Sequence, residues 1–235
     1  MDRHSNVPST PASSGSHARG NRRDLSLPPK KSPPRHPHAR PSDLAPQLCN
    51  TCRQEIAVCD SVHYGSMETG YRLLCSRCFN EEVARQGDLD FQHVQFDPVE
   101  MRDAVGDPHQ FHFRLHLLGD RVALNAFELK DGAPRGYEFQ VLGDAEADLF
   151  ALMAQMIERM RRALAMHHLE KEHGQFHIAD MTARGRITWD SDEDGHVPLL
   201  VIDGHEITWE QFGRMLMTFE GFQFKLEIRD KSEEI

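Results

Sequence analysis

The 235-residue chain has no run of apolar side chains long enough to cross a bilayer, which takes about 20 in succession. Its first five residues, MDRHS, are polar or charged after Met1, and no apolar core segment follows them. We therefore expect no secretory signal and predict a cytoplasmic protein that does not enter a membrane. Cysteines stay reduced in the cytoplasm, so clustered cysteines are interpreted as metal ligands rather than disulfides.

The sequence also lacks the motifs of common enzyme families. It contains no G-x-x-x-x-G-K-[ST] phosphate loop, no G-x-G-x-x-G after a strand and no G-x-S-x-G turn. Among the fifteen histidines, His168 precedes Glu172 by four residues, but the H-E-x-x-H arrangement of zinc proteases is absent. No catalytic residue is assigned, and the pattern favours a non-enzymatic protein over an enzyme.

Positive charge is scarce outside the N-terminal residues. Residues 1–45 hold eight Lys or Arg and three Asp or Glu, whereas the rest of the chain holds 19 basic and 34 acidic side chains. The formal net charge is −10. Because binding to phosphate backbones requires dense positive charge, this acidic body argues against general nucleic-acid binding.

The N-terminal residues 1–46 are poor in apolar side chains and contain nine of the thirteen prolines, with much Ser, Arg and His. Such a segment cannot bury enough apolar surface to fold, so we predict a disordered Pro/Arg-rich tail. A docking arm for nucleic acid or for a proline-recognising domain is the alternative.

Only five cysteines are present, but four of them form two C-x-x-C pairs, Cys49/Cys52 and Cys75/Cys78. Two such pairs complete the tetrahedral sulfur shell that Zn²⁺ prefers, and a fully thiolate shell is structural because no position remains for a substrate water. We predict that these four cysteines bind one structural Zn²⁺. Reduced, unoccupied dithiols are the alternative, and a single redox pair would leave the other pair unexplained. Cys59 is expected to be a small buried residue.

The zinc module is predicted to span residues 47–88. A strand-like stretch at 56–64 follows the first pair, a turn at 65–70 leads to a short strand at 71–74, and residues 79–85 after the second pair are helix-like. A knuckle, a hairpin and a second knuckle that opens a helix resemble a treble-clef module. A zinc ribbon, with both knuckles on hairpins, is the alternative.

Residues 89–180 are predicted to form an antiparallel meander and a long helix. Phe91, Val94 and Phe96 precede Pro98, and three alternating segments then mark the strands at 111–117, 121–127 and 137–141, with a tight turn at Gly119-Asp120 and a loop at 131–136. From an N-cap at Asp144 to Gly174, apolar residues recur every three or four positions. This spacing predicts an amphipathic helix of about seven turns that covers the apolar face of the sheet.

Residues 181–235 are predicted to form a C-terminal unit that packs with 89–180 as one body. Strands are expected at 186–189, 198–202 and 205–207, with a hairpin turn at Asp203-Gly204. Thr208 and Gln211 have the spacing of a capping box that begins a shorter helix, which ends at Gly221. Residues 222–228 alternate as a last strand.

Two polar groups outside the cysteine pairs are further candidate sites. Residues 190–195 begin like a calcium-binding EF-hand loop, but Val201 stands where a bidentate Glu is needed, so a solvated acidic turn is predicted. His112, Arg114 and His116 project from one strand face, either as a polar ligand-binding surface or as the solvated side of a sheet.

Three segments carry a resemblance to a known family: LCSRCFN at 74–80, FHFRLHL at 111–117 and VIDGHEITWEQFGRMLMTFEGFQFKLEI at 201–228. They resemble an uncharacterised family of bacterial proteins of unknown function. The resemblance extends from about Cys49 to the C-terminus and omits the tail. It implies a bacterial, cytoplasmic protein with a metal-binding N-terminal module, and it brings no activity, substrate or catalytic residue.

The predicted fold class is therefore α+β, with a treble-clef-like or zinc-ribbon-like module followed by antiparallel sheets that one long helix and one shorter C-terminal helix cover. The first functional hypothesis is a non-enzymatic, zinc-containing adaptor or regulatory protein that binds a protein partner. The second is an enzyme of unknown class that uses His, Arg and Glu side chains on a sheet face. The third is nucleic-acid binding through the zinc module and the basic tail.

Overall fold

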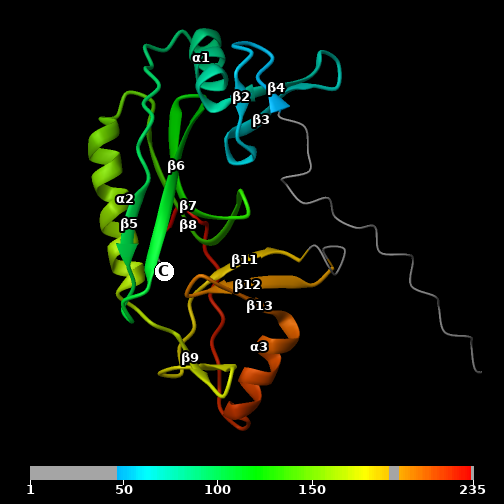
Figure 1. Ribbon diagram of the computed structural model, residues 1–235, viewed down its shortest axis with the longest axis vertical. Helices are drawn as coiled ribbons and strands as arrows, with labels where there is room; N and C mark the ends of the chain where they lie inside the picture. Colours follow the sequence, from blue (N-terminus) through cyan, green and yellow to red (C-terminus); the bar gives the residue numbers. More distant parts are fainter. Residues whose placement is uncertain (1–46, 191–195, 234–235) are drawn as a thin grey trace, which may run out of the picture. The chain divides into compact units, whose positions relative to one another are not determined.

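The computed structural model of the protein describes residues 47–190 and 196–233. The predicted tail at 1–46 lies outside the described residues, and so does the acidic turn after Asp190. Within the described residues, several antiparallel sheets are combined with a few helices (Figure 1), which confirms the α+β class. None of the helices in this part of the chain is both long enough and apolar enough to cross a membrane.

The N-terminal part consists of two short ladders, one turn of 3-10 helix and a helix. Its elements are β1 (Gln47–Leu48), β2 (Glu55–Ile56), η2 (Val58–Asp60), β3 (Ser61–Ser66), β4 (Gly70–Cys75) and α1 (Ser76–Gly87). β1 pairs with β2, and β3 pairs with β4. The strand predicted at 56–64 is interrupted by η2, because Ser61 Oγ donates to the Val58 carbonyl at 2.9 Å and stabilises a local turn. The helix predicted at 79–85 lies within α1.

A four-stranded antiparallel sheet, in the order β5-β6-β7-β8, forms the centre of the chain. Its strands are β5 (Val99–Arg102), β6 (Pro108–Leu118), β7 (Arg121–Lys130) and β8 (Ala133–Asp144). The predicted loop at 131–136 is instead a two-residue turn, since Asp131 and Gly132 adopt φ of 54° and 77°, as a tight hairpin requires. The three-strand prediction missed β5, and the stretch before it is a loop whose Phe91 and Phe96 pack on the core.

Helix α2 (Leu149–Leu164) is shorter than predicted at both ends. Asp144 belongs to β8, and Asp148 caps the helix by accepting a hydrogen bond from the Phe150 N–H at 2.9 Å. Gly174 does not end a helix but lies in the turn between β9 (Leu169–Glu172) and β10 (Gln175–Ile178). The cause is tertiary, because Asp203 Oδ2 accepts the N–H groups of both His168 and Leu169 at 2.7 Å and directs the chain into the hairpin.

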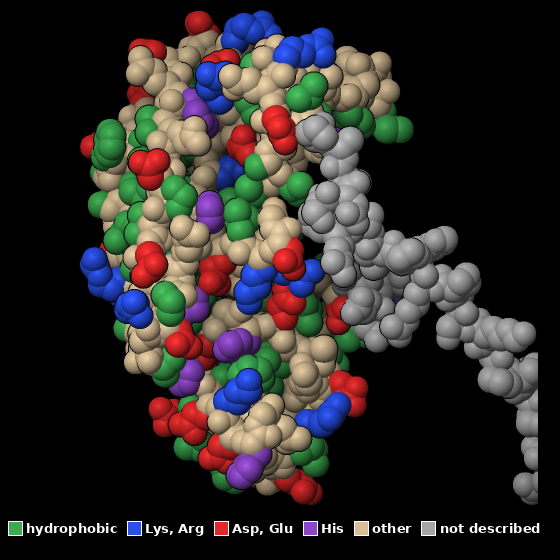
Figure 2. Space-filling view, in the orientation of Figure 1, with side chains coloured by type: hydrophobic (Ala, Val, Ile, Leu, Met, Phe, Trp, Pro, Cys, Tyr) green, Lys and Arg blue, Asp and Glu red, His purple; other side chains and the backbone are tan. Residues whose placement is uncertain are grey.

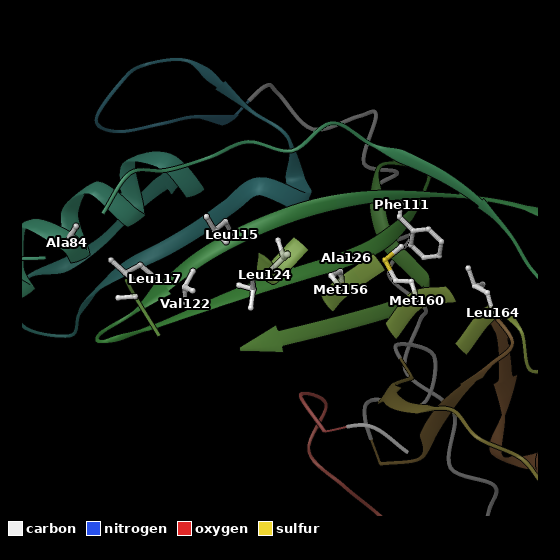
Figure 3. Close-up of a cluster of buried hydrophobic side chains, with 12 residues drawn as sticks. Ala84, Phe111, Leu115, Leu117, Val122, Leu124, Ala126, Met156, Met160 and Leu164 are labelled. Atoms are coloured by element: carbon white, nitrogen blue, oxygen red, sulfur yellow. The ribbon is translucent and has the colours of Figure 1, made fainter. Parts of the chain in front are cut away.

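The largest hydrophobic core lies between α2 and one face of the central sheet. Figure 3 shows its side chains, with Met156 and Met160 of α2 opposite residues of β6 and β7. Its fully buried members on the three elements are Phe111, Leu115, Leu117, Val122, Leu124, Ala126, Leu152, Met156, Met160 and Leu164. The predicted role of the helix as the cover of the apolar sheet face is confirmed.

The C-terminal unit has a core of its own. β11 (Arg186–Trp189), β12 (Pro198–Ile202) and β13 (His205–Thr208) form a three-stranded antiparallel sheet, followed by α3 (Trp209–Leu216) and η3 (Met217–Phe219). The capping box is confirmed, with Thr208 and Gln211 bonded to each other's backbone N–H groups at 2.8 and 3.2 Å. The last predicted strand, 222–228, is wrong as a ladder, because these residues pair with no strand in the described part of the chain.

Candidate metal centre

The first cysteine pair lies in a loop that joins β1 to β2. The Cys49 N–H donates to the Gln54 carbonyl at 2.9 Å, and the Arg53 N–H donates back to the Cys49 carbonyl at 3.0 Å. Arg53 has a φ of 63°, a left-handed conformation that tightens the loop. The loop is therefore closed by its own backbone, with both thiols on the same short turn.

The second cysteine pair lies where β4 ends and α1 begins. Cys75 is the last residue of β4 and the N-cap of α1, and Cys78 lies in the first helical turn. The Cys75 N–H points at Cys49 Sγ at 3.4 Å, so this backbone group already faces the first pair. The positive end of the helix dipole also favours thiolates at this end of α1.

Asn50 holds the two loops together. Its N–H donates to the Leu73 carbonyl at 2.8 Å, and the Leu73 N–H donates to Asn50 Oδ1 at 2.7 Å. These two bonds bridge 23 positions of sequence and join the first loop to β4, two residues before Cys75. Hydrogen bonds to the backbone therefore help to bring the two cysteine pairs together.

The four thiols form one compact group. All four Sγ atoms lie within 4.8 Å of one another, and Cys52 Sγ lies 3.9 Å from Cys75 Sγ. A tetrahedral zinc site with Zn–S bonds near 2.3 Å has sulfur atoms ~3.8 Å apart. The thiols are too far apart to be disulfide-bonded and are free. The two pairs therefore come together as predicted, in a group that could bind one metal ion.

Without a bound cation, the number of cysteines in this group that can be deprotonated to thiolates is limited. Burial raises the pKa of the Cys49 thiol, but N–H groups of Cys52, Cys75 and Thr51 outweigh this and lower it to about 6. For Cys75 and Cys78, burial raises the pKa, and the neighbouring sulfurs raise that of Cys78 further. The backbone thus favours a thiolate at Cys49, whereas burial opposes thiolates at Cys75 and Cys78, and a divalent cation would reverse that opposition.

The hydrophobic core beside the cysteines is small. Its buried members are Cys49, Ile56, Leu74, Cys78 and Phe79, so two of the five are themselves candidate ligands. A core of this size contributes little free energy of folding by itself. A metal ion bound by the four cysteines would add to the stability of this part of the chain.

Asn80 docks α1 onto the central sheet, a role that sequence analysis did not detect. Its Nδ2 donates to the Leu115 carbonyl at 2.8 Å, and its Oδ1 accepts the Leu117 N–H at 2.7 Å. The side chain is fully buried and also contacts His93 Nδ1 at 2.8 Å. β6 continues beyond the residues that pair with β5. There the Asn80 amide takes the place of a neighbouring strand. The only signal in the sequence is a polar residue on the inward face of a helix that begins at a cysteine pair.

The polar face of β6 lies against the cysteine module. Arg114 Nη1 donates to the Cys59 carbonyl at 2.7 Å, while His116 Nε2 lies 3.3 Å from Ser76 Oγ and its ring meets Phe79 edge-on at 5.4 Å. Arg114 and His116 are therefore interface residues and do not form an open ligand surface. Cys59 is half-buried and stands outside the sulfur group.

This packing predicts a pH-dependent stability. Burial, reinforced by Arg114, His93 and Lys231, lowers the pKa of His116 to about 4, against about 6.5 in an unfolded chain. Between these values the unfolded state binds more protons than the folded state. The folded state therefore has its full stability above pH 6.5 and loses it as the pH falls toward 4, by at most about 3 kcal/mol.

We expect urea unfolding of His116→Gln to depend less steeply on pH than that of the wild type in this window. Cysteine protonation at low pH affects both proteins, so it cancels in the comparison. His63→Gln, at an exposed position on β3, is the control and should follow the wild type. Parallel pH profiles for the wild type and His116→Gln would contradict the assignment.

A second polar cluster lies at the other end of β6, and sequence analysis also missed it. His109 Nδ1 lies 2.8 Å from Glu128 Oε1, and His109 Nε2 lies 3.3 Å from Asp103 Oδ2. Glu128 Oε2 accepts the Tyr137 N–H at 2.8 Å, and burial raises the pKa of Tyr137. The signal was present, since His109 and Glu128 occupy apolar-face positions of their strands. The two carboxylates face opposite ring nitrogens, so the cluster fixes the imidazole and does not converge on a single cation.

Three of the four arginines of the cysteine module lie near acidic side chains. Arg72 and Arg85 lie 3.6 and 2.8 Å from Glu82, and Arg77 lies 3.9 Å from Glu81. On the face drawn in Figure 2, basic and acidic side chains are likewise interspersed among the described residues. This mixed charge differs from the basic stripe that phosphate backbones require.

Comparison with protein families gives three consecutive matches. The first is a domain of unknown function (DUF7685) at residues 48–90, which includes all four cysteines of the group. Domains of unknown function DUF7686 and DUF7713 match residues 92–165 and 168–233. No curated protein and no solved structure matches the chain. The predicted resemblance is therefore supported in its coarser form: the chain carries three successive domains of an uncharacterised kind, and none of them brings an activity.

Proposed function

We propose that the protein is a non-enzymatic, zinc-containing adaptor or regulatory protein in the cytoplasm, in which Cys49, Cys52, Cys75 and Cys78 bind one structural Zn²⁺. The observation that carries the proposal is the compact sulfur group, with all four Sγ atoms within 4.8 Å. Four thiolates complete the coordination shell of zinc and leave no position for a reacting water. The metal would therefore stabilise the module and take no part in a reaction.

The order of elements favours the treble-clef-like form of the module over the zinc-ribbon-like form. The second cysteine pair lies at the start of α1, after the β3–β4 hairpin, whereas a ribbon would place both pairs on hairpins. The same helix carries Asn80, which fixes the module to the central sheet. Zinc would thus set the position of α1, and α1 would join the module to the rest of the chain.

Two hollows of the described surface lie away from the cysteines. One of about 450 Å³ is lined by residues of α2, Val141 and Ser232, and a second of about 300 Å³ lies beside the start of α2. Neither is lined by the four cysteines or by the His109 cluster. In the larger hollow, Arg159 donates to the backbone carbonyls of Gln140 and Ser232, which gives it a structural role.

Elemental analysis of freshly purified, tag-free protein tests the proposal. We expect one zinc per chain in the wild type and in Cys59→Ser, and loss of zinc in Cys75→Ser/Cys78→Ser. Cys59 is the matched control because it is a free cysteine of the same module outside the sulfur group. Absence of stoichiometric zinc from the wild type, or equal loss of zinc in both variants, would overturn the assignment.

A further inference from the structure

The C-terminal segment 222–228 presents a row of large apolar side chains to solvent. Four alternate residues of this segment form the row, with exposed fractions of 66% for Phe222, 91% for Phe224, 73% for Leu226 and 69% for Ile228. Single exposed apolar residues are ordinary, but a contiguous row of four large ones marks an interaction surface.

The segment has the geometry of a strand without a partner. Lys225 Nζ lies 3.1 Å from Glu227 Oε2, and Arg229 Nε donates to Glu227 Oε1 at 2.7 Å. Side chains two residues apart share one side only in an extended chain, so the charged residues lie on one side and the apolar row on the other. In the described part of the chain, residues 223–229 belong to no ladder.

Both ends of the segment are held in place. At its start the Phe222 N–H donates to the Phe219 carbonyl at 2.9 Å, next to Gly221 with a φ of 86°. Beyond its end, Arg159 of α2 donates to the carbonyls of Ser232 at 2.8 Å and Lys231 at 3.1 Å. A strand that is already extended and anchored loses less conformational freedom on pairing than a free tail does.

We propose that two copies of this chain pair through 222–228 as antiparallel strands, with the two-fold axis at Leu226. This register places Lys225 of each copy opposite Glu227 of the other, which gives two pairs of opposite charge. An axis at Lys225 or at Glu227 would place like charges opposite each other, and a parallel arrangement would place Lys225 opposite Lys225. Charge on the polar side therefore selects one register among these.

Three of the four apolar residues of the row face one another in the same register, whereas Phe222 stands opposite Asp230. Phe224 faces Ile228 of the second copy, and the reciprocal pair lies across the axis, so the contact is closed and isologous. Pairs of an aromatic and a β-branched side chain are among those that stabilise antiparallel strands. Each backbone supplies the ladder that the other lacks, which accounts for a strand-like segment that has no partner among the described residues of its own chain.

The N-terminal residues 1–46 fit this role less well. Nine prolines in that segment remove backbone donors that a ladder needs, and its few apolar residues do not alternate. In a second copy, by contrast, the single segment 222–228 supplies an apolar row, unpaired backbone groups and charges in the complementary order.

Sedimentation velocity of the full chain, from about 1 to 200 µM, measures the association. We expect a concentration-dependent dimer. Lys225→Glu and Glu227→Lys each place like charges opposite and should weaken the dimer about ten-fold, whereas the double variant should restore it to within about two-fold of the wild type. Phe224→Asp should abolish the dimer, while Met67→Asp, at the equally exposed tip of the β3–β4 hairpin, should leave it intact.

Exchanging the charges of Lys225 and Glu227 in the double variant makes the test specific for this register. A protein that stays monomeric throughout this concentration range would overturn the proposal. So would a dimer that Phe224→Asp leaves unchanged, or one that the double variant fails to restore. Thermal unfolding should be the same for Phe224→Asp and the wild type at concentrations where both are monomeric, because the side chain is exposed. The result does not depend on the metal, since the segment lies outside the zinc module.

Discussion

Replacing Cys75 and Cys78 by serine is expected to unfold the module formed by β1 to β4 and α1 while the β5–β8 sheet stays folded. Zinc binding to four thiolates contributes about 10–16 kcal/mol in small modules at pH 7, far more than a core of five buried residues. The core of the central sheet is formed with α2, and α1 adds only Ala84 to its buried members, so the sheet should stay folded without the metal. The cysteine module and the central sheet should therefore respond differently to the loss of the metal.

Hydrogen–deuterium exchange resolves this difference by segment. In Cys75→Ser/Cys78→Ser, amides of β3, β4 and α1 should exchange within the shortest labelling time, while those of β6, β7 and α2 keep their protection. Cys59→Ser serves as the control and should match the wild type in all segments. Retained protection of β4 and α1 in the double variant would show that the module folds without the metal.

Replacing Asn80 by alanine is expected to cost about 3 kcal/mol of unfolding free energy, the second-largest effect that we predict. The substitution leaves the Leu115 carbonyl and the Leu117 N–H buried without their partner, at about 1–3 kcal/mol for each group. Asn80→Asp keeps the shape and the acceptor, but it loses the donor to the Leu115 carbonyl. It should therefore be destabilising as well.

Urea unfolding with zinc in excess measures this effect without interference from metal loss. Glu81→Ala is the matched control, because Glu81 is the exposed neighbour of Asn80 on α1 and makes only a surface ion pair. Its unfolding free energy should change by no more than about 0.5 kcal/mol. If Asn80→Ala is as stable as Glu81→Ala, the amide does not hold α1 on the sheet.

Where sequence reasoning failed, a contact distant in sequence was responsible. Apolar spacing continued past Leu164, yet the helix ends there because Asp203, 35 residues after His168, binds the backbone of the next hairpin. The alternation of 222–228 correctly identified an extended, two-faced segment. It could not show that the described part of the chain holds no strand to pair with it.

The sequence by itself determined the α+β class, the α2 cover of an apolar sheet face, the capping box at Thr208 and the choice of four cysteines as a candidate zinc set. These features depend on local spacing, which the order of residues records directly. Only the tertiary structure decided which contacts hold the sulfur pairs together, namely the Asn50–Leu73 bonds, and that Asn80 and Arg114 join the module to the sheet. Such contacts satisfy buried polar groups between segments far apart in the chain, so no local pattern announces them.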